Sequence, residues 1–197
     1  MTVASDASFA DNSIDRKSSQ AFAIKLFGGL IGWRANKQQT VTTSTTEAEL
    51  LALSQAAKEA IFASRLITEL SRGEQQLPTA KVTIQCDNQQ TIRLVTRELV
   101  QLQTRLRHVD IHHHWLRQEI AEGRIDVAYT PSAELMADGL TKALPRQKWP
   151  DFLQQLGLTD QSQWLARNRE DELKEDESPD DNLNHSDTST LNTLPIR

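Results

Sequence analysis

The most constraining feature of the sequence is a long run of apolar residues at helical spacing, which begins shortly after Ser44. Ser44 and Glu47 form a capping box, in which the serine oxygen accepts a free backbone N–H and the glutamate reaches back to the cap. We expect Gly73 to end the helix. The apolar residues of the run are Leu50, Leu53, Ala57, Ile61, Leu66 and Leu70. The segments that flank this helix therefore decide the fold class.

Segments with the two-residue period of β-strands lie on both sides of the long helix. Residues 22–26 alternate between apolar and small or polar side chains, Gly28-Gly29 predicts a hairpin turn, and 30–34 is the returning strand. Further strands are expected from the N-terminus up to Asp6, at 82–86 and at 125–129. Further helices are expected at 89–97, 111–122, 133–142 and 147–156. This order of strands and helices is that of a mixed α/β domain.

Charge is distributed unevenly along the 197 residues. The formal net charge is −5, but residues 166–197 alone hold nine acidic and four basic residues. The first 165 residues are therefore neutral overall, and the acidity of the chain does not exclude a nucleic-acid partner. Because the acidic segment has no apolar period, we expect one α/β domain over 1–158 and a disordered acidic tail over 159–197.

The composition also indicates the cellular location of the protein. No stretch is long and apolar enough to cross a membrane, and the N-terminus lacks the basic and apolar segments of a secretory signal. The single cysteine, Cys86, excludes an internal disulfide and a cysteine-ligated zinc module, and it suits a reducing compartment. We therefore expect an intracellular, cytoplasmic protein without a membrane partner.

Four acidic residues stand at positions that packing alone explains poorly. Asp6 and Asp87 each follow a strand-like run, Glu49 shares the inward face of the long helix, and Asp138 lies in a short late helix. Carboxylates at the C-terminal ends of adjacent strands can converge at one edge of an open sheet. Such carboxylates repel one another unless divalent cations bind them, and oxygen ligands select Mg²⁺ or Mn²⁺ over zinc. The alternative, four unrelated surface acids, is left open by spacing alone.

Five short motifs occur in one order over residues 2–158, and together they resemble the ribonuclease H domain at the C-terminal end of a copia-type retrotransposon polyprotein. The motifs are Ser5-Asp6-Ala-Ser-Phe9, Ser44-Thr-Thr-Glu-Ala-Glu-Leu50, Cys86-Asp87-Asn-Gln89, Arg107-His-Val-Asp-Ile111 and Ala137-Asp-Gly-Leu-Thr-Lys142. The resemblance implies an α/β, ribonuclease H-like fold with a central five-stranded mixed sheet flanked by helices.

The same resemblance implies an activity. It indicates a metal-dependent endonuclease that cuts the RNA strand of an RNA–DNA hybrid with two Mg²⁺ ions, for which Mn²⁺ can substitute. An upstream reverse transcriptase domain is a further expected partner, and retrotransposon particles are an alternative location. Catalysis and metal binding are assigned by the resemblance to Asp6, Glu49, Asp87 and Asp138.

Glu49 and Glu47 lie two residues apart, and only one of them matches the catalytic glutamate of the family. The family has its glutamate just before a Leu- and Ala-rich helical run, which Ala48-Glu49-Leu50 matches better than the surroundings of Glu47. The capping box independently gives Glu47 a structural role. The sequence departs from cellular ribonucleases H in the loop before the last aspartate, because residues 131–137 contain no histidine. The proton-transfer step is therefore left without an evident residue.

A basic region with several histidines has three interpretations. His108, His112, His113 and His114 include a pair four residues apart, as in metal sites, but no cysteine is near and arginines surround them, which disfavours zinc. Contact with the phosphates of a hybrid is an alternative, because such contacts position a duplex without reading its sequence. A merely solvated basic face is the third. The predicted nucleic-acid-binding residues are Arg93, Arg97, Arg105, Arg107 and His108.

Two other functions remain open. A non-catalytic remnant or nucleic-acid-binding module would keep the fold without cleaving anything. A related two-metal nuclease, such as an integrase or a resolvase, would use a similar sheet, but the motifs around Glu49 and Asp138 disfavour it.

Overall fold

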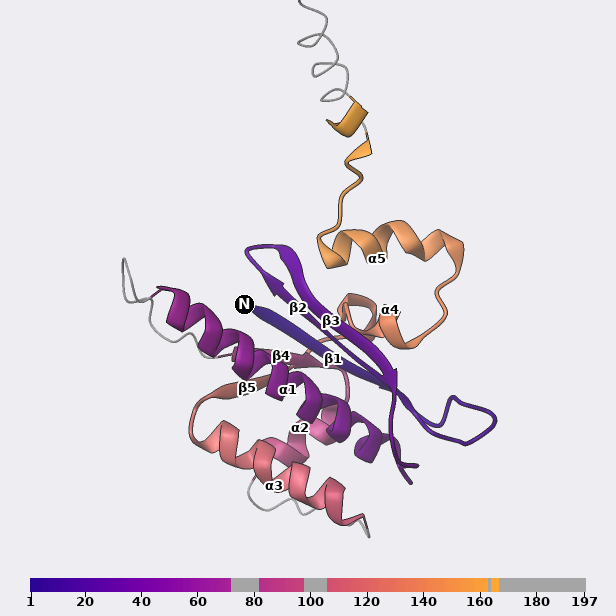
Figure 1. The fold of residues 1–197 in the computed structure, drawn as a ribbon. Helices are drawn as coiled ribbons and strands as arrows, with labels where there is room; N and C mark the ends of the chain where they lie inside the picture. The colour runs from indigo at the N-terminus through magenta and orange to yellow at the C-terminus, as the bar shows by residue number, and fades with distance from the viewer. Residues whose placement is uncertain (72–81, 98–105, 163, 167–197) are drawn as a thin grey trace, which may run out of the picture. The chain divides into compact units, whose positions relative to one another are not determined.

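A five-stranded sheet forms the centre of the first of two units, Met1–Thr159 and Asp160–Arg197, into which the chain divides (Figure 1). The computed structural model describes residues 1–71, 82–97, 106–162 and 164–166. Residues 167–197, which make up most of the predicted acidic tail, lie outside this range. None of the described helices is long and apolar enough to span a membrane.

The order of strands in the sheet is β3-β2-β1-β4-β5. Antiparallel pairing joins β1 to β2 and β2 to β3, whereas β1–β4 and β4–β5 are parallel. The strands are β1 (Thr2–Ser8), β2 (Ser19–Leu26), β3 (Gly29–Lys37), β4 (Val82–Cys86) and β5 (Ile125–Tyr129). The predicted five-stranded mixed sheet flanked by helices is confirmed.

Helices cover both faces of the sheet. The helices are α1 (Thr45–Leu70), α2 (Gln89–Thr96), α3 (Arg107–Ala121), α4 (Asp138–Thr141) and α5 (Trp149–Leu156). Successive residues of a strand point to opposite faces, so Val3 packs in the core under α1, α2 and α3, while Ala4 packs in the core under α4 and α5 (Figure 1). One strand therefore supplies side chains to two separate apolar layers.

The N-terminus of α1 forms where the sequence predicts it, with one difference in detail. Ser44 is the cap, and its hydroxyl accepts from the backbone N–H of Glu47 at 3.2 Å. The Glu47 carboxylate does not reach back to the cap itself but accepts from the N–H of the preceding Thr43 at 2.6 Å and from its hydroxyl at 2.7 Å. The helix ends at Leu70 with Ser71 as its cap, and Gly73, its expected end, lies outside the described residues.

Two local predictions are wrong. The hairpin turn is Phe27-Gly28, one residue earlier than predicted, because Leu26 pairs with Gly29 and both turn residues have positive φ, 50° and 87°. Residues 133–142 do not form one helix. A 3-10 turn (Ser132–Glu134) is followed by extended backbone at Leu135, and α4 begins only at Asp138. This break lets residues 135–137 all bury their side chains against the sheet.

Candidate functional site

Three carboxylates from distant parts of the chain converge at one edge of the sheet. Asp6 lies in β1 and Asp87 directly follows β4, and the parallel register Ala4↔Gln85, continued by two residues, sets these aspartates side by side. Asp138 is the first residue of α4, which packs against β1 and β2. One oxygen each of Asp6, Asp87 and Asp138 lie within 4.8 Å of one another. The structure thus brings together Asp6 and Asp138, which are 132 positions apart in the sequence.

Glu49 reaches the same region from the first turns of α1. It is 6% exposed, and its Oε1 accepts from the backbone N–H of Ala7, next to Asp6, at 3.3 Å. Its other oxygen, Oε2, is buried and has no hydrogen-bond partner among the residues that the structure describes. Burial, reinforced by the negative charges of Asp6 and Asp87, raises the pKa of Glu49 to about 9. We call Asp6, Glu49, Asp87 and Asp138 the acid cluster.

Asp6 is the most deeply buried member of the acid cluster, with 1% of its surface exposed. Burial raises its pKa above the ordinary value, although a hydrogen bond donated by the Thr141 hydroxyl and the charge of Lys142 both act in the opposite direction. Burial of two carboxyl groups in one place is costly unless something compensates their charge. The acid cluster therefore has the electrostatics of a cation site.

Three polar residues around the acid cluster were missed at the level of sequence. Ser132 donates from its hydroxyl to Asp87 Oδ2 at 2.6 Å, Thr141 donates to Asp6, and Lys142 contacts the Asp138 carboxylate. Thr141 and Lys142 follow Asp138 by three and four positions, so their place on one turn of helix was a usable signal. Ser132 lies 45 residues from its partner, and no local pattern indicates it.

Lys142 is a cation that contacts the acid cluster through Asp138. Burial lowers its pKa, but contact with Asp138 and the charges of Asp6, Asp138 and Asp87 outweigh that effect and raise the pKa above its ordinary value. A fixed positive charge is therefore held at the acid cluster.

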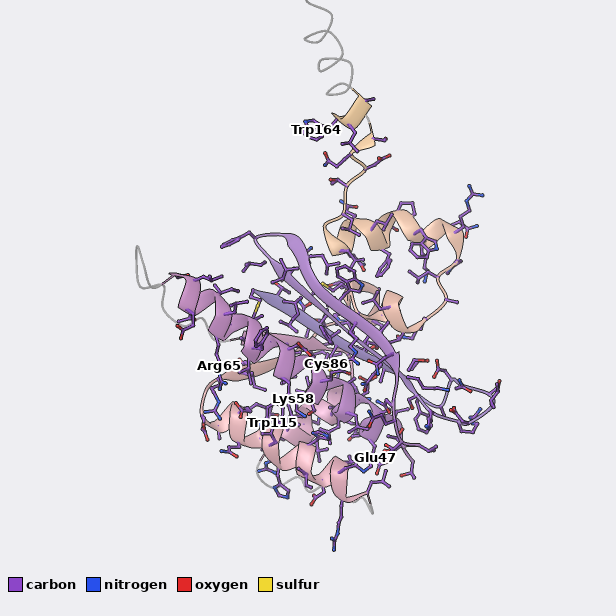
Figure 2. All side chains as sticks on the ribbon, viewed as in Figure 1. Glu47, Lys58, Arg65, Cys86, Trp115 and Trp164 are labelled. Atoms are coloured by element: carbon purple, nitrogen blue, oxygen red, sulfur yellow. The ribbon has the colours of Figure 1, made fainter. Side chains whose placement is uncertain are left out.

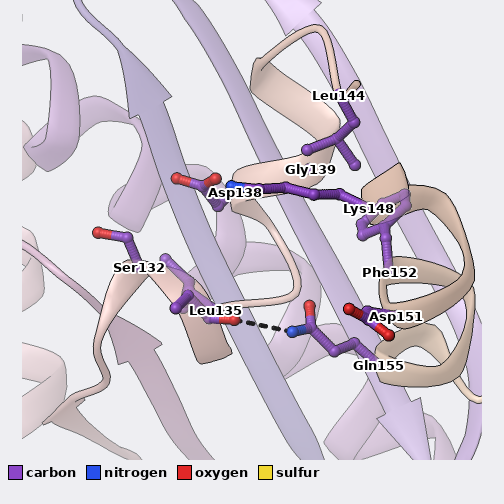
Figure 3. Close-up of a pocket in the computed structure, with 10 residues that line it drawn as sticks. Ser132, Leu135, Asp138, Gly139, Leu144, Lys148, Asp151, Phe152 and Gln155 are labelled. Carbon is purple, nitrogen blue, oxygen red and sulfur yellow. Dashed lines mark hydrogen bonds between the residues drawn. The ribbon is translucent and has the colours of Figure 1, made fainter. Parts of the chain in front are cut away.

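A pocket of about 240 Å³ adjoins the acid cluster (Figure 3). Asp138 and Ser132 contribute to its wall, and Gln155 of α5 donates to the backbone carbonyl of Ala133 at 2.8 Å, which ties α5 to the 3-10 turn. Gly139 lies where any side chain would meet the Phe152 ring, since an added Cβ would come within 2.4 Å of it. Packing of α5 on α4 thus holds Asp138 in place.

The histidines of α3 are largely accounted for by packing. His113 is 3% exposed, and its Nε2 bonds to the backbone carbonyl of Leu94 in α2 at 3.1 Å. A carbonyl oxygen can only accept, so Nε2 is the donor in this hydrogen bond, and burial lowers the pKa of His113. His114 is exposed and lies 3.6 Å from Asp110. Asp110, His113 and His114, which we call the α3 cluster, also have ligand atoms within 4.8 Å of one another.

The other two histidines face a polar groove of about 540 Å³ between β3, α1 and α3. His108 bonds through Nε2 to the Thr40 hydroxyl, and His112 bonds through Nδ1 to the Ser54 hydroxyl, both at 2.9 Å. Burial lowers the pKa of His112, and the positive charge of Lys58 lowers it further. Lys58 also lies over the Trp115 ring, 5.5 Å from its centre (Figure 2).

The predicted nucleic-acid-binding arginines lie on two elements. Arg93 and Arg97 are exposed on α2 and at its end, and α2 starts two residues after Asp87. Arg107 is exposed at the start of α3. Arg105 lies outside the described residues.

The chain is similar in sequence to Pol polyproteins of transposons. No family model matches it. The retrovirus-related Pol polyprotein from transposon TNT 1-94 of Nicotiana tabacum is 33% identical over 144 residues, which are 73% of this chain and 10% of that protein. The one from transposon RE1 of Arabidopsis thaliana is 29% identical over 155 residues, 79% of this chain and 10% of that protein. The chain thus spans about a tenth of the length of these relatives.

Among solved structures, a ribonuclease H1 isolated from compost superposes with a TM-score of 0.50. The superposition covers 71% of this chain and 90% of that one, at 13% sequence identity. At this identity the likeness concerns the fold alone.

Proposed function

Because the chain is homologous to the Pol polyproteins of plant transposons and folds as a ribonuclease H, we propose that it cleaves the RNA strand of RNA–DNA hybrids. It would then be the ribonuclease H domain of a copia-type retrotransposon. The observation that carries the proposal is the acid cluster, in which carboxylates from β1, β4 and α4 converge and Glu49 has a buried oxygen without a partner.

The acid cluster fits a pair of hard divalent cations. All four side chains offer carboxylate oxygens, which favour Mg²⁺ or Mn²⁺ over softer metals. The unpartnered Glu49 Oε2, together with the burial that raises the pKa values of Glu49 and Asp6, supports a site that a bound cation would complete. Asp6, Glu49, Asp87 and Asp138 would hold the ions. Two such ions, when bound, supply a nucleophilic water and stabilise charge on the departing 3′ oxygen.

The surrounding residues have defined parts in this proposal. Thr141 and Ser132 each donate a hydroxyl hydrogen bond to one aspartate, which fixes the direction in which the free carboxylate oxygens point. Lys142 neutralises Asp138, and its side chain remains 46% exposed, within reach of a bound phosphate. The acid cluster would therefore present oriented oxygens and one cation to the substrate backbone.

Substrate contacts would come from the basic residues of α2 and α3. Arg93, Arg97, Arg107 and His108 are the described candidates for phosphate contacts, and Arg105 is a further one. Such contacts would place the hybrid across the sheet edge without reading its sequence. The reverse transcriptase domain of the same polyprotein is the proposed partner that delivers the hybrid.

The test is cleavage by the full chain of an RNA–DNA hybrid labelled on the RNA strand. We expect cleavage with Mg²⁺ or Mn²⁺ and none with EDTA, and none of single-stranded RNA or duplex DNA of the same sequence. Asp6→Asn should abolish cleavage while its far-ultraviolet circular dichroism stays that of the parent. A parent chain that binds the hybrid but never cleaves it would overturn the proposal in favour of a binding module, and cleavage of duplex DNA would indicate another nuclease class.

A further inference from the structure

Cys86, the only cysteine of the chain, lies against the acid cluster rather than deep within an apolar layer alone. It is the last residue of β4, directly before Asp87, and it is fully buried beneath α1 (Figure 2). Its Sγ, one carboxylate oxygen of Glu49 and one of Asp87 all lie within 4.8 Å of one another. A sulfur ligand and two oxygen ligands therefore face one point.

A second observation shows that this point is not satisfied by the protein itself. Glu49 is 94% buried, and its Oε2 has no hydrogen-bond partner among the described residues. A buried carboxylate oxygen in this condition is unfavourable, and a cation beside it relieves the cost. Packing alone explains a small buried cysteine, but it does not explain why that cysteine adjoins a carboxyl group that has one unpartnered oxygen.

We propose that Glu49, Cys86 and Asp87 form a binding site for one soft or borderline dication of the Zn²⁺ or Cd²⁺ class. Carboxylates alone favour hard cations, and one thiolate in the ligand set shifts the preference towards zinc and softer metals. On binding, the S–H bond of Cys86 and the O–H bond of the Glu49 carboxyl group break, metal–sulfur and metal–oxygen bonds form, and both protons pass to the solvent. The sulfur itself is neither oxidised nor reduced.

This site shares Glu49 and Asp87 with the proposed Mg²⁺ site. A soft dication would therefore compete with Mg²⁺ for two carboxylates and inhibit cleavage. This inhibitory consequence rests on the proposed function, whereas the binding of the soft metal does not.

The test is a titration of the metal-free full chain with CdCl₂. Ultraviolet absorption and calorimetry monitor the binding. Cadmium–thiolate bonds absorb in the ultraviolet, and with a single cysteine in the chain that absorption reports on Cys86 alone. We expect one equivalent of Cd²⁺ to produce the band. In Cys86→Ser the band should be absent, and the dissociation constant for Cd²⁺ should rise at least about tenfold. Cys86→Ala gives the same readouts if the serine variant does not fold.

A matched control addresses the α3 cluster, which also has ligand atoms close together. His114→Asn should keep both the absorption band and the Cd²⁺ affinity of the parent. Binding that follows His114 and not Cys86, or binding without the band, would overturn the proposal and leave Cys86 as a packing residue.

Inhibition is measured separately, as the Zn²⁺ concentration that halves the Mg²⁺-dependent rate of each protein. This concentration should be at least about tenfold higher for Cys86→Ser than for the parent. A parent chain that shows the cadmium band but never cleaves a hybrid would refute the proposed function and leave the metal site standing. Equal inhibition of both proteins would refute the inhibitory role of Cys86.

Discussion

The acid cluster and the α3 cluster both bring three or more potential metal ligands together, but they differ in what those side chains already do. In the α3 cluster, His113 donates to Leu94 across the α2–α3 interface, and His114 lies in solvent beside Asp110. In the acid cluster, Glu49 keeps a buried oxygen without a partner, and burial raises the pKa values of Glu49 and Asp6.

This difference shows that ligand types at ligand spacing are not enough to make a metal site. His113 joins two helices and so contributes to stability, and its Nε2 already bonds to the Leu94 carbonyl. A carboxyl group that the fold buries without a full set of partners is favoured as a carboxylate only when a cation lies beside it, and otherwise it keeps its proton. The unpartnered Oε2 of Glu49, rather than the residue types, distinguishes the acid cluster from the α3 cluster.

The largest expected effect concerns the two glutamates at the start of α1. Glu49→Gln should lower hybrid cleavage by about a thousandfold or more, because a metal contact is worth several kcal/mol and each 1.36 kcal/mol is a factor of about ten. Glu47→Gln is the matched control, since its amide oxygen can still accept the two hydrogen bonds from Thr43. Single-turnover rates would measure both. Loss of cleavage in Glu47→Gln alone would reverse the assignment.

A pH dependence of stability follows from the raised pKa of Glu49. Without metal, the folded chain keeps this proton up to about pH 9, whereas the unfolded chain loses it near the ordinary value of 4.5. Between these values the unfolded state binds fewer protons, so stability falls as pH rises, by on the order of a few kcal/mol in total. Urea unfolding with EDTA from pH 5 to 9 would measure it.

Glu49→Gln is the control for this pH dependence, because the amide does not titrate and most of the slope should disappear. Asp6, whose pKa is also raised by burial, should account for part of the remainder. Stability that stays constant with pH in the parent would show that Glu49 is ionised in the metal-free fold.

Substitutions in the α3 cluster should change the free energy of unfolding but not the affinity for Mg²⁺. His113→Ala removes a buried ring and leaves the Leu94 carbonyl without its donor, which should cost about 2–3 kcal/mol of unfolding free energy. His114→Ala, at an exposed position, should change stability by less than about 0.5 kcal/mol. Mg²⁺ affinity should match that of the parent in both variants. A weaker Mg²⁺ affinity in either variant would mean that the α3 cluster also binds the metal.

The smallest expected effect comes from removing one repelling charge in the acid cluster. Asp87→Asn should raise the melting temperature of the metal-free chain by about 2–4 °C, which corresponds to about 1 kcal/mol. The asparagine oxygen can still accept from Ser132. Millimolar Mg²⁺ should raise the melting temperature of the parent by mass action and that of Asp87→Asn by less. If neither change moves the melting temperature, the carboxylates do not repel one another in solution.

Much of the fold follows from local patterns. The Ser44 cap of α1 and the two-residue period of the strands each depend on residues close together in sequence, and the structure agrees with both. One prediction from local pattern is wrong, the single helix over 133–142. In the structure Leu135 packs against the sheet in extended backbone, which interrupts the helix. The acidic positions 6, 49, 87 and 138 were also selected from the sequence, first by their places in the predicted elements and then through the resemblance.

Only the tertiary structure decided which residues surround those acids and which potential ligand atoms lack a hydrogen-bond partner. Ser132 reaches Asp87 across 45 positions and Thr141 reaches Asp6 across 135, and neither pairing leaves a periodic trace in the sequence. The same holds for the bond of His113 to Leu94 and for the unpartnered oxygen of Glu49. Helix and strand periods arise from dihedral angles along the chain, whereas the partners of a buried polar atom depend on how distant elements pack.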